Sequence, residues 1–180
     1  MKIAFLIPST TKGTKAKKLE DTYLFKYLIN SLAHTLSTEH SYTFYYAIDD
    51  NDKLYHKLQT KKKILNKNTY KLINKNLNIT PVILSTKGIE KGNVVGYWNM
   101  LFKKAYEDKN DYFVQCGDDI LFLHRNWLEL CIRHLHFDIG LGATSPKDIG
   151  NPNLMTQSVV SRKHMEIFGY YYPPELTSWF

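Results

Sequence analysis

The chain has 180 residues, 43 % of them hydrophobic, so it can form a core of its own and is not a disordered segment. Its 24 Lys and Arg residues against 17 Asp and Glu give a formal charge of +7. The excess is mostly lysine among Asn and Thr, without a nucleic-acid-binding motif, and we expect no nucleic-acid partner. No apolar stretch is long enough to cross a bilayer, which predicts no transmembrane segment and a cytoplasmic protein.

The chain begins with an apolar run, Lys2–Ile7, which predicts a central strand of a parallel sheet. Pro8, Ser9 and Thr10 follow it in a loop that carries hydroxyls and backbone N–H groups. Loops at the carboxyl ends of parallel strands often face a ligand. A plain connection explains these residues equally well.

Helical and strand patterns then alternate, which is typical of an α/β domain. Asp49 and Asp50 open an acidic cluster after the second predicted strand, where a carboxylate could bind a ribose or a base; a turn that caps the next helix is the commoner explanation. Asn99 lies near the packed side of a helix and bonds either backbone or a ligand. The predicted elements are a helix at Glu20–Leu36, a strand at Ser41–Ile48, a weak helical pattern at Leu54–Leu77, a strand at Thr80–Ser85 and a helix at Val94–Tyr106.

Two adjacent carboxylates, Asp118 and Asp119, follow Gly117 after the apolar run Tyr112–Val114. The run predicts a fourth buried strand, which places both carboxylates at the carboxyl end of the sheet. Unpaired carboxylates are costly to bury, and Mg²⁺ or Mn²⁺ would hold them there. A solvated Gly-Asp-Asp turn is the alternative, and from these residues alone the two are about equally favoured.

The last third is predicted as a helix at Trp127–His136, a strand at Met155–Val160 and a helix beginning at Arg162. An aromatic segment broken by prolines, Gly169–Phe180, follows. Because the chain stops in an apolar pair, we expect a single domain over residues 1–180 that is incomplete at its C-terminus. The two cysteines, Cys116 and Cys131, have no metal-ligand spacing and are expected to be reduced and packed.

In this order of strands, helices and acidic turns, Ile3–Phe180 resembles the nucleotide-sugar-dependent glycosyltransferases of the GT-A fold, and most of all the inverting family 2. The resemblance implies a Rossmann-like α/β fold with a mostly parallel sheet flanked by helices. Pro8-Ser9-Thr10 resembles the loop after the family's first strand. Asp49-Asp50-Asn51-Asp52 resembles its Asp-Asp-Gly-Ser turn, which implies that Asp49 contacts the nucleotide base.

The stretch Cys116-Gly117-Asp118-Asp119 resembles the family's Asp-x-Asp metal motif, with cysteine in place of the first aspartate. The resemblance implies that Asp118 holds Mn²⁺ or Mg²⁺ through the diphosphate and that Asp119 shares this task. Asn99 matches the family's Arg-Asn pair, of which the arginine is missing. The catalytic base is expected beyond the last residue, and Glu175 is the only nearby carboxylate that could take its place.

The function implied is metal-assisted transfer of a sugar, with inversion, from a nucleotide-diphosphate sugar to a hydroxyl of a glycan or another acceptor. A UDP-sugar is the favoured donor, and Tyr170–Tyr172 with Trp179 would pack against sugar faces. Two alternatives stay open. One is a catalytically inactive nucleotide-sugar-binding domain. The other is a nucleotidyltransferase, because Lys12–Lys15 weakly resembles the basic, Gly-rich signature of those enzymes.

Overall fold

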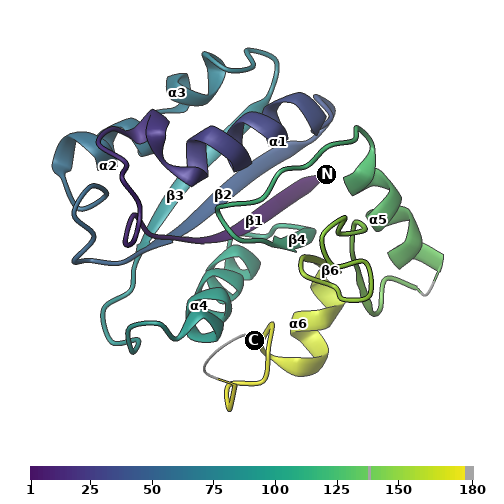
Figure 1. The fold of residues 1–180 in the computed structure, drawn as a ribbon. Coiled ribbons are helices and arrows are strands. Elements are labelled where there is room, and N and C mark those ends of the chain that lie inside the picture. Colours follow the sequence, from purple (N-terminus) through teal and green to yellow (C-terminus); the bar gives the residue numbers. More distant parts are fainter. Residues whose placement is uncertain (138, 177–180) are drawn as a thin grey trace.

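A computed structural model describes residues 1–137 and 139–176 of the chain. Its centre is a six-stranded sheet with the strand order β3-β2-β1-β4-β6-β5 (Figure 1). Strands β1 to β4 are parallel, β6 is antiparallel to β4, and β5 is antiparallel to β6. The strands are β1 (Lys2–Ser9), β2 (Ser41–Ile48), β3 (Asn78–Ser85), β4 (Tyr112–Gln115), β5 (Ala143–Thr144) and β6 (Ser158–Ser161).

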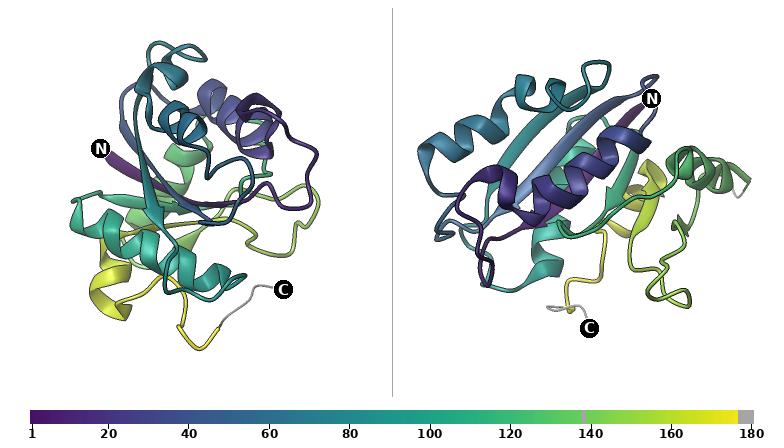
Figure 2. Two further views of the ribbon diagram at one scale, coloured as in Figure 1. Left: turned by 90° about the vertical axis from the view of Figure 1, so that its left-hand side faces the viewer. Right: turned by 45° about the horizontal axis from the view of Figure 1, so that its top comes forward.

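Helices cover both faces of this sheet, as the two views of Figure 2 show. One face carries a 3₁₀ turn and a π-helical segment that runs into α1, together with α2, α3 and α5; the other face carries α4 and α6. The predicted α/β fold with a mostly parallel sheet is confirmed. The elements are the turn Leu19–Asp21, the π-helical segment Leu24–Ile29, α1 (Asn30–Thr35), α2 (Leu58–Leu65), α3 (Lys67–Lys71), α4 (Val94–Glu107), α5 (Trp127–Phe137) and α6 (Arg162–Phe168).

Strand β1 is buried on both faces, which explains why its sequence is a continuous apolar run. Phe5 points into the core on the α1 and α5 side, whereas Ala4 and Leu6 point into the core beneath α4. All three side chains are fully buried. The prediction of a central parallel strand at the start of the chain is therefore confirmed.

Two predicted helices are shorter or less regular in the structure. The pattern at Leu54–Leu77 forms two short helices, because the chain leaves the helix at Asn66, whose side chain then accepts from the N–H of Asn68 and caps α3. Upstream, the α-helix predicted from Glu20 begins only at Asn30, and the turns before it are 3₁₀ and π-helical.

Strand β6 begins later than predicted, at Ser158, and all four of its residues are buried between β4 and β5. Strand β5 has two residues, too few to leave a periodic pattern in the sequence. Among the described residues, no helix combines the length and the apolar character that a membrane span requires.

Replacing Phe5 with alanine should reduce the free energy of unfolding by about 3–5 kcal/mol, because it leaves a cavity at the centre of the core. The Phe5 ring packs edge-on against Phe44, with 5.0 Å between ring centroids, and also contacts Trp127. Urea unfolding measures the loss. Leu72→Ala is the control, since this leucine is 88 % exposed and its removal should change stability by less than about 0.5 kcal/mol. Equal losses in the two variants would contradict the fold.

Candidate functional site

The carboxyl ends of three parallel strands lie side by side at one edge of the sheet. Ser9, the last residue of β1, is paired with Ile48, the last residue of β2. On the other side of β1, the N–H of Cys116 donates to the carbonyl of Leu6 at 3.3 Å, so the chain after β4 continues beside the end of β1. This pairing brings Ser9 next to Asp118.

The Ser9 hydroxyl connects two side chains at this edge. Its oxygen lies 2.5 Å from Oδ2 of Asp118, to which it donates, and 3.0 Å from the hydroxyl of the fully buried Tyr55. A short bond to a carboxylate is typical of a charge-assisted hydrogen bond. The sequence predicted Pro8 and Ser9 in a loop, as either a ligand-facing segment or a plain connection, but strand β1 continues through Ser9, whose hydroxyl orients the carboxylate of Asp118.

The carboxyl group of Asp118 has its pKa raised to about 6. Burial is the main cause and the neighbouring charge of Asp119 adds to it, while hydrogen bonds from the Ser9 hydroxyl and the Thr10 N–H act in the opposite direction. Asp119 itself is exposed. A Cβ atom at Gly117 would lie 3.0 Å from Oδ1 of Asp119, so the glycine leaves room for this carboxylate above the turn.

Cys116, which the sequence resemblance matched to the first aspartate of the Asp-x-Asp motif, has a fully buried side chain. Burial, together with the nearby carboxylates of Asp118 and Asp119, raises the pKa of its thiol well above the usual range. Cys116 is therefore a free, fully buried cysteine that packs in the core, as the sequence predicted. Asp118 and Asp119 are thus the two carboxylates of this stretch that could hold a cation, and a metal role for them stays a prediction.

Asp52 accepts from the N–H groups of the turn that follows it, which is the commoner explanation that the sequence gave for the acidic cluster, and it has a further role that the sequence did not reveal. Its side chain is 5 % exposed and holds the loop after β1 against the loop after β2. It accepts from the N–H and hydroxyl of Thr11 at 2.6 and 2.7 Å, from the Thr10 hydroxyl, and from the N–H groups of Leu54 and Tyr55. Burial acts to raise the pKa of Asp52, but these donors outweigh it and lower the pKa below its usual value.

Asp49 and Asp50, the other two acids of this turn, are more accessible. Oδ2 of Asp49 lies 3.5 Å from Nζ of Lys91, and Oδ2 of Asp50 accepts from the Ser85 hydroxyl at 3.2 Å. Of the two, Asp49 lines the cavity described next. A nucleotide contact of either residue stays a prediction.

A cavity of about 600 Å³ lies at the ends of β1 and β2, bounded by the loops that Asp52 holds together. Lysines dominate its lining, and within the described residues the only ion pair that they form is that of Lys91 with Asp49. Clustered positive charge in a hollow attracts anions. The lining residues are Thr10, Thr11, Lys12, Gly13, Thr14, Ala16, Lys17, Asp49, Asn51, Asp52, Lys53, Leu54, Lys57 and Lys91.

Asn99 uses its amide to hold the segment after α6 against α4. Its Oδ1 accepts from the N–H groups of Tyr171 and Tyr172 at 2.9 and 3.0 Å, and its Nδ2 donates to the carbonyl of Tyr172 at 2.8 Å. Of the two uses that the sequence left open for Asn99, backbone bonding is the one seen here. These hydrogen bonds do not test the predicted contact of Asn99 with a nucleotide, which stays a prediction.

The aromatic segment differs from the expectation at Tyr171. This ring is buried against Phe102, with 5.1 Å between centroids, and its hydroxyl bonds Ser158, so it cannot stack on a sugar. Trp179 lies outside the described residues. Glu175 is exposed, and among described residues its carboxylate takes part in no hydrogen bond or ion pair. Its role as a base stays a prediction.

A divalent cation fits the donor set of Asp118 and Asp119. Within residues 1–137 and 139–176, no group of three or more His, Cys, Asp or Glu side chains could enclose a metal. Mg²⁺ and similar ions are often held by one or two carboxylates, with substrate phosphates completing the shell. Two adjacent carboxylates whose charges repel each other suit this arrangement, although metal binding itself stays a prediction.

No model of a known protein family matches the sequence, and a search of curated proteins finds no match. Among solved structures, a mannosyltransferase from Pyrobaculum calidifontis, in complex with GDP-Man and Mn²⁺, is similar with a TM-score of 0.58 and 14 % identity, over 96 % of this chain and 48 % of that one. A cytidylyltransferase from Leptospira borgpetersenii has a TM-score of 0.52 and 12 % identity, over 99 % and 68 %.

These similarities define the fold as the one shared by GT-A glycosyltransferases and nucleotidyltransferases. The chain spans about half the length of the mannosyltransferase. At such low identity the likeness concerns the fold alone, so the activity has to be argued from the site.

Replacing Asp52 with alanine should reduce the free energy of unfolding by roughly 2–4 kcal/mol, because buried N–H groups of Thr11, Leu54 and Tyr55 lose their acceptor. Urea unfolding measures this loss. Asp21→Ala is the matched control, since Asp21 is exposed and makes no side-chain hydrogen bond or ion pair with a described residue. A loss no larger than that of the control would contradict the role of Asp52.

The raised pKa of Asp118 predicts how stability depends on pH in the absence of divalent cations. The folded-state pKa of about 6 exceeds the usual value of 3.8, so between these values the folded state binds more protons than the unfolded state. Stability should therefore fall as pH rises from about 4 to about 6. Asp118→Asn should lose this part of the slope.

Unfolding measured at several pH values in EDTA provides the test, with Asp21→Asn as the control that keeps the wild-type slope. Identical slopes for wild type and Asp118→Asn would show that this carboxyl group has an ordinary pKa.

Proposed function

We propose that the chain carries the nucleotide-binding site of a transferase that moves a sugar from a nucleotide-diphosphate sugar to an acceptor hydroxyl. The observation that carries the proposal is the lysine-lined cavity next to a carboxylate pair at the carboxyl ends of parallel strands. Thr10 lines the cavity, and its N–H and the adjacent Ser9 hydroxyl both bond Asp118. A nucleoside diphosphate matches both parts, because it brings anionic phosphates and oxygen ligands for a cation.

In the proposed complex, the base and ribose of the donor lie in the cavity near Asp49, whose carboxylate can accept their hydrogen bonds. The diphosphate lies toward Thr10, with Lys12 and Lys53 as candidates to offset its charge. Pro8 and Ser9, the last two residues of β1, then form the floor beneath it. Asp50 bonds Ser85, and Asn99 bonds the segment after α6. We therefore assign both residues the role of holding neighbouring segments in place.

Asp118 and Asp119 would hold Mn²⁺ or Mg²⁺ at the diphosphate. The bound cation would supply Lewis-acid neutralisation of the leaving group. Ser9 keeps Asp118 oriented for this task, and Gly117 leaves space for the carboxylate of Asp119. The raised pKa of Asp118 describes the metal-free protein, where burial and its neighbour both disfavour the charged form.

In the transfer step, the acceptor oxygen forms a bond to the anomeric carbon while the bond from that carbon to the diphosphate oxygen breaks. The nucleoside diphosphate leaves with the bonding electrons, and the hydroxyl proton passes to a carboxylate base. A single displacement of this kind inverts the anomeric centre. Glu175, exposed and without a described partner, is the candidate base within this chain.

A second candidate function is nucleotidyl transfer. The loop after β1 includes Lys12, Gly13 and Thr14, and all three line the cavity. Basic, Gly-rich loops in this place are expected to hold a nucleoside triphosphate. In that reaction a sugar-phosphate oxygen attacks the α-phosphorus, and pyrophosphate leaves. The products therefore separate the two functions.

Titration calorimetry with UDP, GDP and CDP should show binding that strengthens with Mn²⁺ or Mg²⁺. Asp118→Asn should weaken the metal-dependent binding about tenfold or more, equivalent to about 1.4 kcal/mol, because it removes a charged ligand. Lys12→Gln together with Lys53→Gln should weaken binding even without metal. Asp21→Asn and Lys75→Gln are matched controls on exposed residues outside the cavity.

Turnover assays then assign the reaction. Release of nucleoside diphosphate from a nucleotide sugar, reduced in Glu175→Gln, supports sugar transfer with that base. Pyrophosphate release from a nucleoside triphosphate and a sugar phosphate would identify a nucleotidyltransferase instead. Donor binding without either product would identify an inactive binding domain, and no nucleotide binding at all would overturn the proposal.

A further inference from the structure

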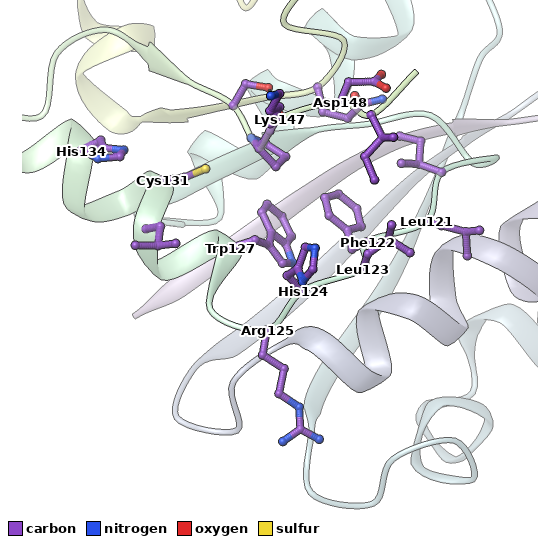
Figure 3. Close-up of a pocket in the computed structure, with 16 residues that line it drawn as sticks. Leu121, Phe122, Leu123, His124, Arg125, Trp127, Cys131, His134, Lys147 and Asp148 are labelled. Carbon is purple, nitrogen blue, oxygen red and sulfur yellow. The ribbon is translucent and has the colours of Figure 1, made fainter. Parts of the chain in front are cut away.

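We propose that a second cavity, separate from the lysine-lined one, binds a single amphipathic molecule with an apolar body and one anionic group. This cavity has a volume of about 690 Å³ and lies between the segment after Asp119, helix α5 and the loop that precedes β6 (Figure 3). Pockets for small molecules commonly measure about 300–1,000 Å³. It shares no lining residue with the lysine-lined cavity.

The wall of this cavity is apolar and aromatic. Phe122 and Trp127 are stacked with 4.1 Å between ring centroids and an interplanar angle of 15°, and both rings are held in the core. Leu123 and Leu130, which also line the cavity, are 59 % and 44 % exposed. A fixed aromatic floor with accessible leucines around it is what an apolar ligand body requires.

The charges at the rim favour an anionic group. Figure 3 places Lys147 at the edge of the cavity beside Asp148. Asp148 is committed to its own loop, because Oδ1 accepts from the N–H groups of Gly150 and Asn151 and Oδ2 accepts from the Thr156 hydroxyl. Lys147 forms no ion pair with any described residue. It is therefore available to a carboxylate or a phosphate on the ligand.

Two further residues with polar N–H groups, Trp127 and Arg125, line the cavity. Nε1 of Trp127 is buried without a hydrogen-bond partner among the described residues, although buried N–H groups are normally paired. Arg125 extends away from the stacked rings in Figure 3, and its Nε donates to the carbonyl of His34 at 3.3 Å. The anionic group is thus assigned to Lys147 and not to Arg125.

The shape of the site argues for one molecule and not for a membrane surface. Its lining comes from three separate parts of the chain that enclose a hollow, with the stacked rings at its floor. On a membrane-binding face, apolar side chains project outward and polar residues surround them, usually along one amphipathic helix. The proposed ligand class is therefore a single-chain carboxylate or phosphate, such as a fatty acid or an alkyl phosphate.

The probes are dodecyl phosphate, dodecanoate and 1-dodecanol, each below its micelle concentration, titrated into the full chain without nucleotide or metal. Calorimetry and tryptophan fluorescence should show saturable binding of both anions at one site, at least about tenfold tighter than that of the alcohol. Because neither nucleotide nor metal is present, this result is independent of the proposed transferase activity.

Two sets of variants locate the site. Leu123→Glu and Leu130→Glu should weaken binding of both anions about tenfold or more, while Leu72→Glu, on a more exposed leucine outside the cavity, should not. Lys147→Gln should abolish the preference for the anions over the alcohol, while Lys75→Gln keeps it. Circular dichroism confirms that each variant is folded.

Three results would overturn the proposal. They are the absence of saturable binding, equal weakening by Leu72→Glu, and binding to phosphatidylglycerol vesicles without binding to the single-chain probes. Equal affinity for dodecanol and the two anions would overturn the assignment of Lys147.

Discussion

Parallel pairing of β1 with both β2 and β4 is the constraint on which the rest of the structure depends. Since parallel strands end at the same edge, the loops after all three must meet there. Two side chains fix how they meet. Asp52 joins the loops after β1 and β2, and the Ser9 hydroxyl joins the end of β1 to Asp118 after β4. The cavity and the carboxylate pair are consequences of these two links.

Acidic and basic side chains are unevenly distributed at this edge, and that distribution gives the site its chemical character. The carboxylates of Asp118 and Asp119 lie after β4, where burial and the neighbouring charge of Asp119 raise the pKa of Asp118 and disfavour its charged form. The cavity at the ends of β1 and β2 is lined by five lysines together with Asp49 and Asp52, and among the described residues the only ion pair of these lysines is that of Lys91 with Asp49. A phosphate-bearing ligand with a divalent cation would relieve both imbalances at once, because it supplies negative charge to one side and positive charge to the other.

The second cavity has a different chemistry because it lies on the α5 side of the segment after Asp119. There the stacked rings of Phe122 and Trp127 belong to the same hydrophobic core as Phe5 of the central strand. The core thus extends to the surface at this point. The chain from Asp118 to Trp127 separates a polar, lysine-rich hollow from an apolar one.

The sequence by itself determined the central strands, helix α4, the α/β class and the carboxylates at the strand ends, because apolar periodicity and local turn chemistry are written in neighbouring residues. It could not distinguish Asp52 from Asp49 and Asp50, which stand in one acidic run. Only the tertiary structure decided that Asp52 is buried under five hydrogen bonds, that Tyr171 is a core residue, and that the lysines of three separate segments line one cavity. Three of the five bonds to Asp52 come from Thr10 and Thr11, and Tyr171 packs against Phe102, so these outcomes depend on residues far away in the chain that no local pattern encodes.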